Sequence, residues 1–322
     1  MYQTQLLSLI RKKIADDASL IEAIAGALDI SYDAAHRRSS LKSKFSLEES
    51  VLLARHFDIS LDRLFEVTDT RYVAVEKTKP INNEQELEEY FINSCQSLEP
   101  ILKKEGCSVL YSAKDIPLFY TVNNDLLGKF KLYVWLKLLS PGFSRKGFEE
   151  FKPGKALTEA AMKLGELYKK VAITEIWDIT TVNSTLKQIH FYHAAGQIST
   201  ENALALCKSL KKLIREMENK VNANREDYQL YYNELLLMNN NVLVNHPYGQ
   251  LLFIPFSILS YYSTSDSHTC RQAEGSLKKQ LQQSKLLNTS GEKERNYFFN
   301  KIYTKIDALH QLLEASLLLD FE

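Results

Sequence analysis

The chain has 322 residues, 45% of them hydrophobic and 25% charged, and its 40 lysine and arginine residues balance its 40 aspartate and glutamate residues. This composition is typical of a globular protein with room for two or three domains, and it excludes disordered and collagen-like chains. The zero net charge excludes a basic field over the whole protein, so any nucleic-acid binding has to come from a local cluster.

Five short helices are predicted within residues 1–66, because five residues there can cap a helix N-terminus. Glu22 follows Ser19, and Glu49 follows Ser46, at the three-residue spacing of a capping box. So many capped starts in a short span predict a small helical domain. The predicted helix starts are Thr4, Ser19, Ser31, Ser46 and Ser60.

Residues 67–80 lose the helical periodicity, and we interpret them as a linker whose middle could form a strand. A helix is predicted from residue 82 to about Lys104. Residues 107–122 are rich in β-forming side chains and are broken at Pro117. The next segment, 125–139, is so apolar that we expect a helix buried in the core or in a subunit interface.

The second half of the chain alternates between helical and β-rich patterns. After a loop-rich stretch at 140–154, helices are predicted at 155–171, 175–195 and 200–221. Three β-rich segments then predict a three-stranded antiparallel meander, because turn signals separate them. Two helices are expected to close the chain. The strand segments are 227–238, 241–246 and 249–262, and the closing helices are 266–283 and 291–319.

These elements predict a mainly α protein with a small antiparallel sheet, in the α+β class. We expect a helix-turn-helix bundle at 1–66, a linker at 67–80 and a larger α+β domain at 81–322 for sensing or dimerisation. The first residues, MYQTQLLSLIRKK, lack the pattern of a signal peptide, and no apolar run is long enough to span a membrane. Four scattered cysteines favour reduced thiols, so a cytoplasmic protein is expected.

A helix-turn-helix needs two short helices joined by a tight turn, so that the second helix can lie in the DNA major groove. Residues 19–39 fit this description, with Asp29, Ile30 and Ser31 as the turn and Ile30 as a core side chain. The segment IEAIAGALDISYDAAHRRSSLKSKFSLEESVLLARHFDISLDRLFE resembles the Cro and phage-repressor type of helix-turn-helix domain over about residues 5–66. The order of the later segments is similar to large regulators of this type in Bacteroidetes.

The resemblance implies a DNA-binding transcriptional regulator. Three positions depart from the family pattern: Ile21 stands where a glutamine is common, and Asp29 and Leu41 stand where glycines are common. An apolar Ile21 cannot contact a base edge as an amide does.

The candidate DNA-binding residues lie in and after the second helix of this motif. Residues 34–47 carry four basic side chains and no acidic one, a local charge of +4. From helix geometry we expect one set to face the bases and another to hold phosphates. The first set is Tyr32, Asp33, His36 and Arg37, and the second is Ser31, Arg38, Ser40, Lys42 and Lys44. Asp33 has a second interpretation as a partner of the helix dipole.

A protein-interaction module that does not bind DNA is the alternative, because residues 1–66 carry nine basic and ten acidic side chains, a net charge of −1. An enzyme is the third possibility, although no nucleophile, nucleotide-binding or zinc-protease motif occurs in the sequence. His190 and His193 could ligate a metal from one helical face, but a packed histidine pair is the preferred interpretation. No cofactor or metal is predicted.

Two further expectations concern partners. We expect a homodimer through residues beyond 80, because one short helix-turn-helix contacts few base pairs. The aromatic β-rich segments could line an apolar pocket for a small effector, although ordinary core packing also explains them.

Overall fold

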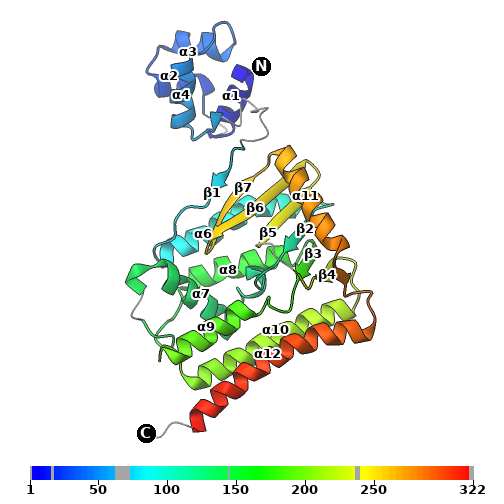
Figure 1. Cartoon of the computed structure of the whole chain (residues 1–322). Helices are drawn as coiled ribbons and strands as arrows, with labels where there is room; N and C mark the ends of the chain where they lie inside the picture. The colour runs from blue at the N-terminus through cyan, green and yellow to red at the C-terminus, as the bar shows by residue number, and fades with distance from the viewer. Residues whose placement is uncertain (1, 16–17, 62–72, 144–145, 236–239, 319–322) are drawn as a thin grey trace. The chain divides into compact units, whose positions relative to one another are not determined.

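The computed structural model of the chain describes residues 2–15, 18–61, 73–143, 146–235 and 240–318. The chain divides into two compact units, Met1–Ala74 and Val75–Glu322, and each is described by itself. Figure 1 shows the elements of both.

The first unit contains four described helices around one small core. Its buried side chains come from every helix, Leu6 and Ile10 from the first, Ile24 from the second, Ala35 from the third and Leu53 from the fourth. The fully buried alanine lets the third helix approach its neighbours closely. The helices are α1 (Tyr2–Arg11), α2 (Leu20–Leu28), α3 (Tyr32–Ser39) and α4 (Leu47–His56).

Three of the predicted helix starts in this unit are confirmed. Ser19, Ser31 and Ser46 each accept a hydrogen bond from a backbone amide in the first turn of the following helix. Thr4 is wrong as an N-cap, because α1 already begins at Tyr2. The helix expected after Ser60 lies mostly outside the described residues.

The second unit is built on one mixed sheet of eight strands. The central strands β2, β3 and β4 run parallel, and β5, β6, β7 and β1 extend the sheet on one side by antiparallel pairing, with β8 on the other. The strands are β1 (Glu76–Lys77), β2 (Ser108–Ser112), β3 (Ala172–Trp177), β4 (Tyr228–Tyr232), β5 (Asn241–His246), β6 (Gly249–Ser257), β7 (Ser260–Thr264) and β8 (Lys285–Leu286).

Helices cover the two faces of this sheet unequally. Val109 and Tyr111 of β2 pack into the large core, whereas Leu110 packs into a smaller cluster with Cys270 and Leu277. Because side chains alternate along a strand, these are the two faces of the sheet. The helices are α6 (Glu84–Leu102), α7 (Leu126–Leu139), α8 (Lys155–Tyr168), α9 (Asn183–Ala194), α10 (Thr200–Asn222), α11 (Ser267–Gln282) and α12 (Glu292–Leu318), with short 3-10 turns η1 (Leu118–Tyr120) and η2 (Pro141–Phe143).

The helices of the second unit divide unequally between these two clusters. Only α11 contributes the helical side chains of the smaller cluster, whereas α6, α7, α8, α9, α10 and α12 all feed the larger one. Within the larger core α6 packs along α8, and the two longest helices, α10 and α12, run side by side (Figure 1).

The α+β class is confirmed, but the predicted sheet is wrong in size and pairing. Strand β4 pairs in parallel with β3 and not with β5, and the segment 249–262 is a hairpin rather than one strand. The helix predicted at 175–195 begins only at Asn183, because residues 172–177 form the central strand β3. The two polar residues of that strand, Thr174 and Glu175, are adjacent, so the strand shows no alternation of apolar and polar side chains to separate it from a helix.

Candidate nucleic-acid interface

Helices α2 and α3 pack against each other and are joined by the turn Asp29, Ile30 and Ser31. Asp29 adopts the left-handed conformation (φ 52°) that ends α2, and the amide of Ile30 donates to the carbonyl of Ala25 at 3.1 Å. Ile30 is partly buried against the core of the unit. The Ser31 hydroxyl then caps α3 by accepting from the amide of Ala34 at 3.3 Å.

Four side chains predicted to face bases lie on the exposed surface of α3. Tyr32 is 55% exposed, and Asp33, His36 and Arg37 are exposed as well. Among the described residues, no ion pair or side-chain hydrogen bond engages Asp33, His36 or Arg37. Their polar atoms are therefore available to an external partner.

The segment after α3 carries the two predicted lysines. Lys42 and Lys44 are exposed, and no described side chain pairs with either ammonium group. The segment turns at Leu41, which is left-handed (φ 62°) and 53% exposed. Asp29 and Leu41 are thus both in the left-handed conformation, which glycine adopts at a lower cost than other residues.

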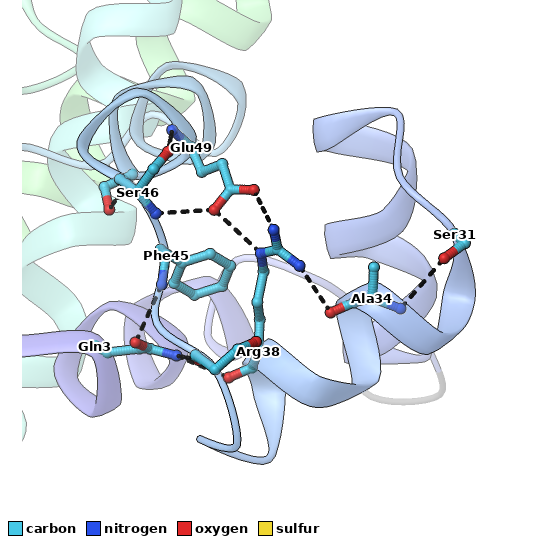
Figure 2. Close-up of polar contacts among 9 residues, drawn as sticks. Gln3, Ser31, Ala34, Arg38, Phe45, Ser46 and Glu49 are labelled. Atoms are coloured by element: carbon cyan, nitrogen blue, oxygen red, sulfur yellow. Dashed lines mark hydrogen bonds and ion pairs between the residues drawn. The ribbon is translucent and has the colours of Figure 1, made fainter.

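Gln3 of α1, which is not among the residues predicted from the sequence, forms hydrogen bonds to this segment. Its amide nitrogen donates to the carbonyls of Arg38 at 2.8 Å and Ser43 at 2.9 Å, and its carbonyl oxygen accepts from the amide of Phe45 at 3.3 Å (Figure 2). These three bonds hold the backbone on both sides of the exposed lysines. A glutamine near the start of a helix gives no sequence signal for such a role.

Arg38 differs from Arg37, its neighbour in the chain. Its guanidinium donates to both carboxylate oxygens of Glu49, at 2.6 and 3.1 Å, and to the carbonyl of Ala34 at 3.2 Å (Figure 2). These hydrogen bonds lower the pKa of Glu49. With its donors engaged inside the unit, Arg38 is a link between α3 and α4 and is poorly placed to hold a phosphate.

Glu49 serves two partners at once. It also accepts from the amide of Ser46 at 2.9 Å, while the Ser46 hydroxyl accepts from the amide of Glu49 at 3.0 Å. The predicted capping box at the start of α4 is therefore confirmed. The same carboxylate that starts α4 anchors Arg38.

The two predicted phosphate-binding serines are exposed but already bonded within the unit. Ser31 accepts from Ala34, and the Ser40 hydroxyl donates to the carbonyl of His36 at 2.6 Å. Each oxygen can still accept or share one further bond.

The histidine pair of α9 has no further candidate metal ligand beside it among the described residues. The Nε2 atom of His193 lies 3.0 Å from the Thr200 hydroxyl, and burial lowers the pKa of His193. Within the part of the chain that the structure describes, no group of three histidine, cysteine, aspartate or glutamate side chains could hold a metal ion.

Lys131, Glu175 and Asp178 are the buried charged side chains among the described residues of the second unit. Lys131 of α7 is 8% exposed, and its ammonium donates to the Thr185 hydroxyl at 2.7 Å and to the Gln188 amide oxygen at 2.8 Å. Burial lowers the pKa of Lys131 to about 8. No cavity described in this unit opens onto this amine.

The second buried group is Glu175 of β3, which accepts hydrogen bonds from three tyrosines. The hydroxyls of Tyr168, Tyr120 and Tyr228 lie 2.6, 2.8 and 3.2 Å from its carboxylate oxygens. The ammonium of Lys220 lies over two of these rings, 5.0 Å from the centre of the Tyr120 ring. Burial is the largest influence on Glu175 and raises its pKa.

The aromatic side chains of the β-rich segments 227–238, 241–246 and 249–262 line neither of two surface cavities in the second unit. Tyr228 and Tyr232 of β4 are buried core side chains, and these two surface cavities, of about 460 and 560 Å³, lie elsewhere. Among the described helices, none combines the length and apolar composition of a membrane span.

No known protein family, curated protein or solved structure matches this chain. The assignment of a function therefore depends on the site itself.

Proposed function

We propose that residues 1–66 form a helix-turn-helix domain that binds double-stranded DNA, and that the protein is a sequence-specific transcriptional regulator. The observation that supports this proposal is that three basic side chains are exposed and have no partner among the described residues. Arg37, Lys42 and Lys44 are exposed, close in sequence and unpaired among the described residues, on and directly after a capped short helix. Such a cluster is suited to phosphates and base edges.

Two kinds of contact are expected from this surface. Arg37, with Tyr32, Asp33 and His36, would face the bases, because these side chains point outward from α3. Lys42 and Lys44 would neutralise phosphates, with Ser31 and Ser40 as further partners of the backbone. Arg38 is assigned to the interior link with Glu49 instead.

The proposal is tested by selecting bound DNA from the native genome and titrating a selected site and a scrambled duplex by fluorescence anisotropy. Lys42→Gln and Lys44→Gln should weaken binding to both duplexes alike. Each should also lower the slope of the logarithm of affinity against the logarithm of salt concentration by about one. Arg37→Ala should cost about 1–3 kcal/mol on the selected site only. Lys208→Gln, which removes an exposed charge from α10, is the matched control and should change nothing.

A domain that contacts protein instead of DNA is the second candidate. The exposed Tyr32 and Leu41 favour it, because apolar side chains on a surface often mark protein contacts. If no duplex is selected, and if all three charge variants behave like Lys208→Gln, this second function replaces the first.

We also propose that the chain dimerises through residues beyond 80, since paired domains would double the length of DNA that is contacted. Sedimentation at micromolar concentration should give twice the chain mass of 37.0 kDa. A monomer both with and without DNA would contradict dimerisation.

A further inference from the structure

A solvent-open surface cavity of the second unit lies between the start of α7 and the start of α8. It has a volume of about 560 Å³, within the range of small-molecule sites. Leu126 and Met162 give it an apolar lining, and Phe151 is fully buried in the core behind them. An apolar group of a ligand would therefore find contacts there.

The same cavity is lined by three lysines, Lys129, Lys152 and Lys155, and by two acidic residues. Both acids already have partners. Asp125 caps α7 by accepting from the amide of Gly128 at 2.7 Å, and Glu159 lies 3.6 Å from the ammonium of Lys155. Neither carboxylate is paired with Lys129 or Lys152.

Lys129 is the most buried of the three lysines. Its ammonium lies 4.3 Å from the centre of the Phe148 ring, and burial lowers its pKa. Glu149, the acid that acts on it, is engaged by the amide of Ser199 at 2.7 Å and by the Asn202 side chain at 3.0 Å. Of the described residues, none forms an ion pair with Lys129 or Lys152.

We propose that this cavity binds a small amphipathic anion, a molecule with one carboxylate or phosphate on an apolar body. The anionic group would lie between Lys129 and Lys152, which lack carboxylate partners, and the apolar body would pack on Leu126 and Met162. This inference does not depend on DNA binding, because it concerns only residues of the second unit.

The test is calorimetric titration of the full chain with decanoate, below the concentration at which it forms micelles. We expect one site per chain. Lys129→Met should weaken binding at least tenfold, because it removes the least hydrated cation. Met162→Trp should weaken binding to a similar extent while it leaves every lysine in place, because the indole fills the cavity.

The controls separate this site from general attraction. Lys170→Met, which removes a lysine of the other cavity, should leave the dissociation constant unchanged. Decanol and inorganic phosphate should each bind at least tenfold more weakly than decanoate. Thermal unfolding of each variant establishes that it folds.

Four outcomes would overturn the proposal: no binding of decanoate, equal binding of decanol, unchanged binding by folded Lys129→Met and Met162→Trp, or binding of phosphatidylglycerol vesicles in place of decanoate. The last would assign these lysines to a membrane surface.

Discussion

Arg38 and Glu49 join α3 to α4 through two parallel hydrogen bonds, the shorter of 2.6 Å. Both side chains are about four-fifths buried, so water competes only weakly with the pair. Arg37 and Arg38 are adjacent in the sequence, yet one is exposed and unpaired while the other is part of the domain's interior. Their substitutions should therefore have separable effects.

Arg38→Gln should destabilise the first unit by about 1–2 kcal/mol, because a partly buried charged hydrogen-bonded pair is lost. Both tryptophans lie in the second unit, so hydrogen exchange of amides in α3 and α4 is the suitable measurement. Protection should fall about five- to thirtyfold. Arg37→Gln is the control, and an equal loss of protection in both variants would contradict the role of the pair.

Leu41→Gly should stabilise the first unit by about 0.5–1 kcal/mol. A left-handed conformation costs a residue with a side chain about 1–2 kcal/mol, and glycine does not have this cost. Part of the gain is lost because glycine increases the conformational entropy of the unfolded chain. The exposed Leu41 loses little buried area. Leu52→Gly, at a similarly exposed position within α4, should instead destabilise the unit, and a loss of protection in both variants would refute the argument.

Lys131 should make the stability of the second unit increase with pH between about 8 and 10.5. Its pKa is lowered to about 8 in the folded protein, so over this range the unfolded chain binds the proton more tightly. The gain approaches about 3 kcal/mol at the upper end. Urea unfolding followed by tryptophan fluorescence should show a flatter pH dependence for Lys131→Met, whereas Lys170→Met should keep the wild-type dependence.

Glu175 should have the opposite effect at pH values above the ordinary pKa of a glutamate. Burial raises its pKa in the folded protein, so the folded state holds the proton more tightly than the unfolded chain does. This contribution to stability is present at low pH and is lost as the pH rises through the raised pKa. Glu175→Gln keeps the shape and a hydrogen-bond acceptor but cannot titrate, so the stability of the variant should not fall as the pH rises through this range. An unchanged dependence of stability on pH would contradict the role of Glu175.

Local signals predicted the first unit well, and non-local pairing limited the prediction of the second. Ser19, Ser31 and Ser46 mark helix starts by hydrogen bonds within three residues, which a sequence displays directly. Strand β3 depends on partners about 60 residues away on either side, and its sequence, AITEIW, has no regular alternation of apolar and polar side chains to distinguish it from a helix.

The candidate interface shows the same limit. Its exposed basic residues are visible in the composition of 34–47, but the engagement of Arg38 depends on the position of Glu49 in another helix. The different roles of Arg37 and Arg38 cannot be read from the sequence, because they depend on a contact with another helix. Gln3 escaped notice for the same reason, since its three partners lie 35 to 42 residues away.

The pairing of β1 with β7 has a consequence for synthesis of the chain on the ribosome. Thr78 and Tyr261, which bond to each other beside these strands, are separated by 183 residues. At a synthesis rate of about 5–20 residues per second, Thr78 emerges roughly 10–40 s before its partner exists. The four described helices of the first unit have local contacts and can fold within that interval. Until the β6–β7 hairpin is synthesised, the nascent protein has a folded N-terminal domain followed by the unpaired strand β1. A chaperone that binds extended segments would act there.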